Sequence, residues 1–181
     1  GEIRTGVGDA RELDLEDASV DAVLLLGPLY HLPRRVDRIR ALSEALRIVR
    51  PGGPVFAAAI SRWAPRLDGE LAQRLYERIG TVSPLIPEVE RTGWMPPLFG
   101  GDFSAYCHRP GQLRAELRSA GLRVVDLVSV EGPAYLLHDV ADRMADPLGR
   151  TVVLETARAI ERVPELLGIG PHLLATGVRP R

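Results

Sequence analysis

The sequence is poor in the residues that build covalent or metal cross-links. Its 181 residues include one cysteine, Cys107, and all 23 basic residues are arginine, a bias to which we attach no functional meaning. A single cysteine excludes an internal disulfide framework and a zinc site built from several cysteines. Because no sequence pattern pairs Cys107 with an activating base, we expect it to be a partly buried structural residue. No His/Asp/Glu cluster has metal-ligand spacing, so we expect no metal.

Strong net charge and long apolar runs are also missing. The formal net charge is -1 at pH 7 and the sequence pI is about 6.5, so no overall basic field would hold nucleic acid or an acidic membrane surface. The longest apolar run, residues 55–60, is shorter than the ~18 residues that a membrane span needs. Together with the lone cysteine, these absences lead us to expect a cytoplasmic protein with neither nucleic acid nor membrane as a partner.

The first 60 residues show the pattern of parallel strands joined by a helix. Residues 2–7 are a short strand candidate, and 20–27 form a near-continuous apolar run typical of a buried parallel strand. Apolar residues recur at helical spacing over 34–49. The Arg-Pro-Gly-Gly turn at 50–53 then ends this helix and leads into a second buried strand at 54–60. We expect a parallel crossover with the helix on one face of a sheet.

Residues 61–109 differ in character from what precedes them. Five prolines surround one clear helix pattern at 67–79. We expect an insertion or lid over the end of the sheet. Its aromatic side chains could line a pocket for an apolar molecule or form the core of the lid, and both alternatives stay open. These aromatic residues are Trp63, Trp94, Phe99, Phe103 and Tyr106.

Regular structure returns in the last third of the chain. The pattern predicts a helix over 109–122, a strand over 123–130 and a last strand over 172–179. Between the strands, 139–163 is mostly one helix, with an interruption expected at Pro147 and Gly149.

Two stretches carry residues suited to ligand recognition. Gly6-Val7-Gly8 is a poor dinucleotide fingerprint, because its third glycine is absent and an acidic loop follows in place of a helix. In that loop, the Asp9 carboxylate could accept from an exocyclic amine and the Ala10 N–H could donate to a ring nitrogen, which is the pattern that recognises adenine. The alternative is that Asp9 only stabilises a turn.

The second stretch follows the predicted buried strand. Gly27 ends that strand, and Tyr30 and His31 come before the next helix. Because ligands of open parallel sheets bind at the carboxyl ends of strands, these two side chains are well placed for a site. They could equally cap the helix and fill a surface crevice.

These motifs, in this order, resemble the latter part of a Rossmann-like, class I S-adenosylmethionine-dependent methyltransferase. The stretch from the Gly-Asp-Ala of the acidic loop to Leu32 carries the resemblance, together with 45–58 around the Arg-Pro-Gly-Gly turn, and a weaker likeness extends to the terminal strand. The resemblance implies a three-layer α/β fold whose sheet is mostly parallel with an antiparallel C-terminal strand. It also implies S-adenosylmethionine as the cofactor, with Asp9 and Ala10 at the adenine, Leu26 and Gly27 along the cofactor, and Tyr30 and His31 between cofactor and substrate.

One departure from the family pattern concerns its glycine-rich loop and ribose-binding acidic residue. Both precede the acidic loop in the family, whereas eight residues precede Asp9 here. We expect that about 60 residues of the family pattern, or two strand-helix units of ~30 each, are missing before this loop. We therefore expect residues 1–181 to be a single, incomplete methyltransferase-like domain that lacks its N-terminal strand-helix units, with 61–109 as its lid.

The expected reaction is methyl transfer to an oxygen or nitrogen of a small molecule. Methyl transfer from a sulfonium requires alignment and, for these acceptors, removal of a proton. His31 is the first candidate base and His108 the second, although His108 could simply begin a helix; Tyr30 and Tyr106 are candidate orienting groups. The rival hypothesis is a non-catalytic binding or dimerisation module that has lost its cofactor loop. A homodimer is therefore one of the alternatives for the partner of this chain. A nicotinamide oxidoreductase is disfavoured because the Gly-x-Gly-x-x-Gly motif is absent.

Overall fold

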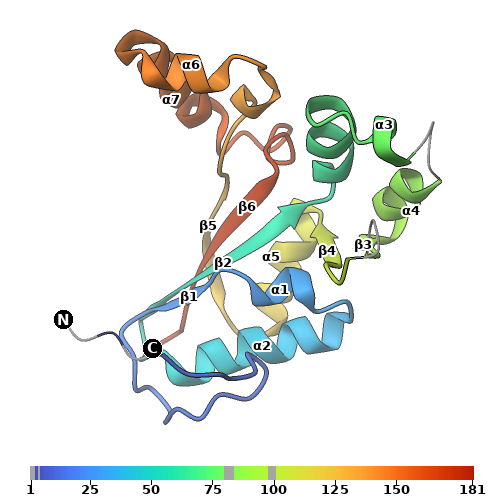
Figure 1. Ribbon diagram of the computed structural model, residues 1–181. Coiled ribbons are helices and arrows are strands. Elements are labelled where there is room, and N and C mark those ends of the chain that lie inside the picture. The colour runs from blue at the N-terminus through green and yellow to red at the C-terminus, as the bar shows by residue number, and fades with distance from the viewer. Residues whose placement is uncertain (1–2, 4, 80–83, 98–100) are drawn as a thin grey trace.

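The computed structural model describes residues 3, 5–79, 84–97 and 101–181. Within them the chain forms a sheet of six strands with helices packed against it (Figure 1). Across these residues, no helix combines the length and the apolar character needed to cross a bilayer.

The predicted parallel crossover is present at the start of the sheet. Strand β1 (Val23–Leu25) leads through the short helix α1 (Pro28–His31) into α2 (Arg35–Ile48), and the chain returns as β2 (Pro54–Ser61). β1 and β2 pair in parallel, with Leu25 opposite Ala57. The turn from α2 into β2 depends on Gly52, whose φ of +81° would strain a residue with a side chain. The Arg-Pro-Gly-Gly turn therefore ends the helix as predicted.

The other strands extend the sheet on both edges of β2. On one edge, β4 (Ala105–His108) pairs in parallel with the carboxyl end of β2, beyond β1. On the other, β6 (His172–Val178) is antiparallel to β2 and pairs in turn with β5 (Arg123–Ser129). The two-residue strand β3 (Trp94–Met95) lies antiparallel to β4. The predicted Rossmann-like α/β class, with four strands in one direction and an antiparallel C-terminal strand, is therefore confirmed.

One face of the sheet is packed and the other is open. The inward-facing residues of β2 alternate with half-buried ones, and α2 and α5 (Pro110–Ser119) cover the buried face. On the opposite face, Leu24 is 67% exposed and Leu26 52% exposed, and Phe56 is half-buried. That face is where the third layer of a three-layer fold would lie. The buried face is apolar throughout the middle of the sheet, through Leu25, Val55, Ala57, Ala59, Leu127, Leu173 and Ala175.

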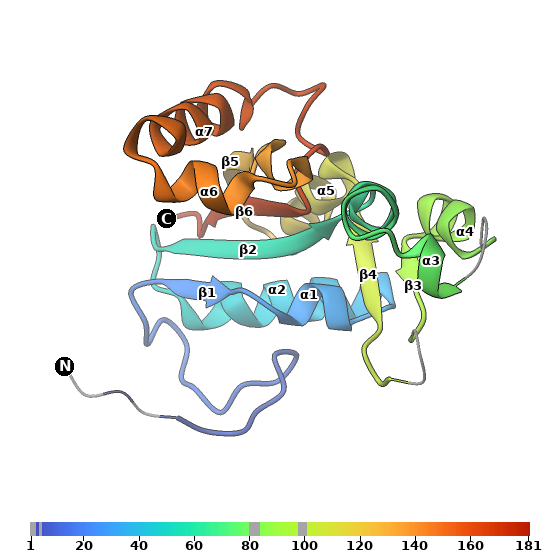
Figure 2. The ribbon, with the colours of Figure 1, turned by 45° about the horizontal axis from the view of Figure 1, so that its top comes forward.

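The C-terminal helical segment divides as the sequence predicts. Helix α6 (Val140–Ala145) ends before α7 (Pro147–Ile160), and the Asp146 carboxylate accepts from the Gly149 N–H at 2.6 Å to cap α7. The two helices form a hairpin beyond the carboxyl end of β5 (Figure 1). Figure 2 shows the same hairpin from a second direction.

The strand predicted over residues 2–7 is wrong for the described residues 3 and 5–7. Residues 3 and 5–8 form no strand, and Ile3 and Val7 are fully exposed. The physical reason is that no described strand lies beside them, so a strand there would have no ladder of hydrogen bonds to complete. Residues 2 and 4 lie outside the described residues.

One prediction for residues 61–109 also needs correction. The helix pattern at 67–79 divides into a π-helix, η1 (Pro65–Ala72), and α3 (Tyr76–Ile79), because Arg74 adopts a positive φ of 53° between them. The segment then continues through α4 (Leu85–Thr92) and returns to the sheet edge as β3 and β4, which the sequence did not predict. Phe99 lies outside the described residues, and the lid assignment stays a prediction.

Candidate functional site

The acidic loop begins with a tight turn built on Asp9. The Arg11 backbone N–H donates to Asp9 Oδ1 at 2.9 Å, and the Glu12 N–H donates to the Asp9 carbonyl at 3.0 Å. The Arg11 guanidinium adds a hydrogen bond to Oδ2 at 2.6 Å. These hydrogen bonds, first that of the Arg11 side chain, hold the pKa of Asp9 at about 2. Asp9 is therefore a permanent carboxylate, and it also has the turn role that the sequence left open.

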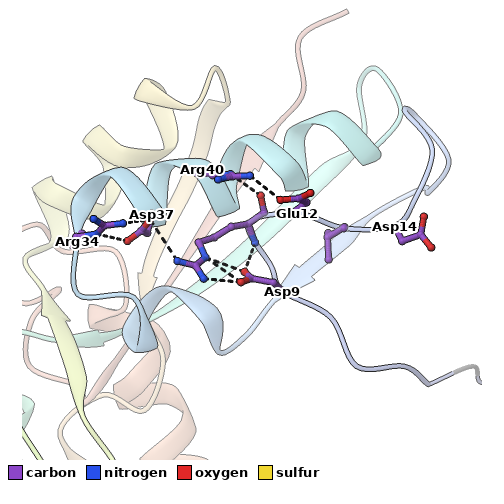
Figure 3. A pocket seen from close by; sticks show the side chains of 8 residues that line it. Asp9, Glu12, Asp14, Arg34, Asp37 and Arg40 are labelled. Atoms are coloured by element: carbon purple, nitrogen blue, oxygen red, sulfur yellow. Dashed lines mark hydrogen bonds and ion pairs between the residues drawn. The ribbon is translucent and has the colours of Figure 1, made fainter.

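Arginines attach this loop to helix α2 (Figure 3). Arg11 Nη1 lies 3.6 Å from Asp37 in the first turn of α2, and Arg34 donates to the same carboxylate at 2.7 Å. Arg40 donates from Nε to the Arg11 carbonyl and from Nη2 to Glu12, both at 3.0 Å. The loop thus lies in a defined position against α2 although it has no regular secondary structure.

A surface hollow of about 580 Å³ lies between this loop and α1. It brings together Asp9, Ala10 and His31, which the sequence singled out in two separate stretches. A charged hollow of about 640 Å³ adjoins it and shares Asp9 and Arg11 (Figure 3). The remaining lining of the first hollow is mainly apolar: Val7, Gly8, Pro28 and Leu32, with Arg11.

Leu26 and Gly27 form the turn between β1 and α1, and Tyr30 of α1 contacts both of them. The Tyr30 hydroxyl donates to the Leu26 carbonyl at 3.1 Å, and the Tyr30 N–H donates to the Gly27 carbonyl at 3.3 Å. The Tyr30 and His31 ring centroids lie 4.7 Å apart. Tyr30 therefore fixes the strand end and supports the His31 ring, while Leu26 stays exposed on the open face of the sheet.

The His31 ring connects the hollow to the 61–109 segment. It is exposed and meets the Phe103 ring edge-on, with centroids 5.6 Å apart. An accessible imidazole at the carboxyl end of a parallel strand is suited to accepting a proton from a bound molecule.

His108, the second candidate base, is fully buried. Its Nε2 lies 3.2 Å from Glu116 Oε2, and its Nδ1 has no hydrogen-bond partner among the described residues. Burial lowers the pKa of His108, which favours the neutral ring. Tyr106 packs edge-on against His108 at 4.8 Å and carries the Arg38 guanidinium 3.6 Å above its ring. This geometry gives His108 and Tyr106 a packing role and no route to a molecule in the hollow.

Cys107 is also buried, as expected. Burial raises the pKa of its thiol to about 12, so the reactive thiolate is scarce at neutral pH. Within the described part of the chain, no group of three or more His, Cys, Asp or Glu side chains is arranged to hold a metal ion.

One histidine that the sequence did not single out lines a further cavity. His172, at the start of β6, lies with Ile60 and Phe103 around a cavity of about 310 Å³ beneath the 61–109 segment. Its ring Nδ1 is 2.5 Å from Glu131 Oε1. The two residues are distant in the sequence and belong to no motif, so only the folded chain reveals the pair.

Comparison with known proteins places this fold and its motifs in a family. A family model described as a methyltransferase domain matches residues 1–57, which include the acidic loop, the crossover and half of β2. The 27-O-demethylrifamycin SV methyltransferase of Amycolatopsis mediterranei is 31% identical over 134 residues, or 70% of this chain and 47% of that protein. The ubiquinone/menaquinone biosynthesis C-methyltransferase UbiE of Acidiphilium cryptum is 39% identical over 72 residues, or 40% of this chain and 26% of that protein. The chain thus spans about half the length of the first of these relatives and about a quarter of the second.

Solved structures agree on the fold. The crystal structure of an S-adenosylmethionine-dependent methyltransferase from Methanosarcina mazei matches 97% of this chain and 66% of its own, with a TM-score of 0.57 and 14% identity. At this identity the likeness concerns the fold alone. Over residues 1–57 the chain matches the methyltransferase-domain family, and its fold is that of the Rossmann-like, class I methyltransferases, whose cofactor is S-adenosylmethionine.

Proposed function

We propose that this protein transfers a methyl group from S-adenosylmethionine to an oxygen or nitrogen of a small molecule. The observation that carries the proposal is the shared hollow of Asp9, Ala10 and His31, which puts an adenine-type recognition edge beside an accessible imidazole. The name of the Amycolatopsis relative, an O-methyltransferase of a rifamycin, supports an oxygen acceptor. The Acidiphilium relative is a C-methyltransferase, so a carbon acceptor is the alternative to test.

The residues around the hollow fit the adenine end of this cofactor. The Asp9 carboxylate is ionised and half-exposed, so it can accept from an amine, while the Ala10 N–H can donate to a ring nitrogen. Apolar surface from Pro28 and Leu32 would cover the face of the base. Leu26 and Gly27 would lie along the cofactor at the end of β1.

His31 would accept the proton that an oxygen or nitrogen acceptor must lose. When bound, the cofactor supplies an electrophilic methyl group, so the tasks of the chain are to align the acceptor and remove its proton. The exposed imidazole of His31 can accept such a proton directly. The tilted Tyr30 ring, with its centroid 4.7 Å from that of His31, would limit the rotation of the His31 ring.

Binding of S-adenosylhomocysteine, measured by isothermal titration calorimetry, tests the proposal. We expect the full-length gene product to bind it in the micromolar range and Asp9→Ala to bind more weakly. Asp14→Ala is the matched control, because it removes a carboxylate from the same loop outside the shared hollow. Absence of binding by the unsubstituted protein would refute the proposed function, and equal losses in both variants would refute the assignment of Asp9.

The exposed apolar face of the sheet favours a second candidate, a binding or dimerisation module. Leu24 and Leu26 stand on this face beside half-buried Phe56, and exposed apolar patches often mark association surfaces. Sedimentation equilibrium would distinguish the candidates: a dimer that dissociates on Leu24→Arg, in a protein that does not bind S-adenosylhomocysteine, would favour the module.

A further inference from the structure

The cavity beneath the 61–109 segment is a second concave site, separate from the Asp9 hollow. Its volume of about 310 Å³ lies at the lower end of the range for small-molecule pockets. Ile60 on β2 and His172 on β6 stand opposite each other in the sheet at one side of it. Most of the remaining lining is apolar: Ala64, Pro65, Leu75, Leu85, Ile86, Met95, Phe103 and Pro171. Four polar side chains join the wall: Asp68, Gln73, Arg78 and His172.

Among these polar groups, His172 is held by a carboxylate from outside the cavity wall, that of Glu131. Glu131 Oε1 lies 2.5 Å from its ring Nδ1, and Glu131 Oε2 accepts the His172 backbone N–H at 3.2 Å. With the carboxylate holding Nδ1, the other ring nitrogen, Nε2, is left for a ligand. The hydrogen bond with Glu131 raises the pKa of His172, so this nitrogen is more often a donor at neutral pH than that of an unpaired histidine.

The loop that leads into His172 is held from three sides. Gly170 N–H donates to Ser129 Oγ at 3.1 Å, and Tyr135 Oη donates to the Ile169 carbonyl at 2.8 Å. At Gly168 a Cβ atom would lie 2.8 Å from Trp63 Cδ1, so the loop and the indole are in close contact. Anchoring of this kind is what a recognition group needs, since a ligand then loses little free energy to ordering it.

Phe103 joins the cavity to the Asp9 hollow. It lines the cavity and also meets His31, the candidate base, edge-on. Phe103 therefore lies between His31 and the cavity that His172 lines.

We propose that this cavity binds the methyl acceptor, a largely apolar ring-containing small molecule, and that His172 Nε2 hydrogen-bonds a hydroxyl or carbonyl oxygen of it. The inference rests on the proposed function, because that function makes the cavity an acceptor site. His31, in the neighbouring Asp9 hollow, stays the candidate base of that function. His172 is a positioning residue, so it determines which acceptors bind and how they are oriented.

Two probes of nearly equal ring size, 2-naphthol and naphthalene, test the role of His172 without any turnover. By equilibrium dialysis we expect the protein to bind 2-naphthol about tenfold more tightly than naphthalene, as one hydrogen bond to a charged group allows. His172→Gln should reduce this preference to about twofold or less. His138→Gln is the matched control, because His138 is exposed and lines none of these cavities, and it should keep the full preference.

A cavity-filling variant tests the location. At Gly69 a Cβ atom would meet only Leu75 Cδ2, at 3.5 Å, so Gly69→Leu adds volume to the cavity wall without backbone strain. This variant should bind both probes at least fivefold more weakly, while its circular dichroism spectrum shows an unchanged fold. Unchanged binding in this variant, or a naphthol preference that survives His172→Gln, would overturn the inference.

Cofactor binding separates this inference from the proposed function. His172→Gln should bind S-adenosylhomocysteine as the unsubstituted protein does. Intact naphthol selectivity in a protein that binds no S-adenosylhomocysteine would refute the methyltransferase function and leave a ligand pocket. If the unsubstituted protein binds S-adenosylhomocysteine but does not prefer 2-naphthol to naphthalene, only the assignment of the pocket is refuted.

Discussion

Helix α2 carries two arginine-carboxylate clusters with opposite exposure. The buried cluster (Arg38, His108, Glu116) lies between α2, β4 and α5, and Arg38 Nη2 is 2.7 Å from Glu116 Oε1 with both side chains almost inaccessible. The loop cluster (Asp9, Arg11, Asp37) lies at the edge of the Asp9 hollow, where the Asp9 side chain is half-exposed. The same two functional groups therefore meet water in one cluster and not in the other.

Burial makes the first cluster a structural device. Arg38 uses Nη1 to donate to the carbonyls of Leu32 and Pro33, at 2.9 and 2.8 Å. These residues directly follow His31, so the buried guanidinium fixes the position of the chain that presents the candidate base. A buried ion pair adds little net stability but is costly to break, because the remaining charge stays desolvated.

Exposure leaves the second cluster able to exchange partners. The Asp9 carboxylate accepts from both the backbone and the guanidinium of Arg11, and water can replace either contact at low free-energy cost. A ligand amine can do the same. The exposure of a guanidinium-carboxylate pair to solvent, and not its chemistry, therefore determines the role of the pair in this protein.

Breaking the buried cluster should have the largest effect. We expect Glu116→Gln to lower the free energy of unfolding by about 3–5 kcal/mol, because it leaves the Arg38 charge buried without a counter-charge. Urea denaturation followed by circular dichroism measures this loss. In the double variant Arg38→Met/Glu116→Leu no charge is stranded, so the loss should be smaller than in Glu116→Gln; an equal or larger loss would mean that packing, and not charge, dominates.

The pH dependence of stability should report on His108 in the same cluster. Burial lowers the pKa of His108 in the folded protein below the ~6.5 of an unfolded chain. Between these two values the unfolded state binds more protons, so the stabilisation is present above about pH 6.5 and is lost as pH falls through that window. We expect the free energy of unfolding to fall more steeply with decreasing pH in the unsubstituted protein than in His108→Gln, by at most about 1.4 kcal/mol per pH unit.

Comparison of the two proteins by urea denaturation from pH 7.5 to 5 isolates this contribution. The His172 pKa is shifted upward by Glu131, so its stabilisation has the opposite sign and is lost as pH rises through its folded pKa. That residue is present in both proteins, so its contribution cancels in the difference. Equal slopes would show that His108 titrates in the folded state as it does in the unfolded chain.

Local patterns predicted the crossover and the two halves of the candidate site. The Arg-Pro-Gly-Gly turn was predictable because proline cannot continue a helix and glycine can adopt a positive φ. Helix α2 was predictable from the spacing of its apolar residues. The family resemblance implied that Asp9 and His31 lie at one ligand, and the hollow between the acidic loop and α1 brings them together although the described residues before Asp9 form no strand. These features depend on residues close in sequence or on the order of motifs along the chain.

Features set by distant contacts were not predictable. A strand pattern at 2–7 needs a neighbouring strand, and none of the described strands provides one. The burial of His108 depends on α2 and α5 closing over β4, which no spacing within the 61–109 segment reveals. The His172–Glu131 pair forms only when β6 enters the sheet beside the end of β5. Each of these features depends on tertiary contacts that the local sequence does not predict.

Removing Arg11 should have the smallest effect and the opposite direction. Arg11 occupies both oxygens of the Asp9 carboxylate, so it competes with any amine that binds there. We expect Arg11→Ala to tighten S-adenosylhomocysteine binding by about two- to fivefold, the range of one exposed ion pair, with little change in urea stability. Arg40→Ala is the matched control, since it removes an arginine that contacts the same loop without contacting Asp9. Weaker binding in Arg11→Ala alone would mean that Arg11 holds Asp9 in its binding position, and the loop cluster would then resemble the buried one in function as well as in composition.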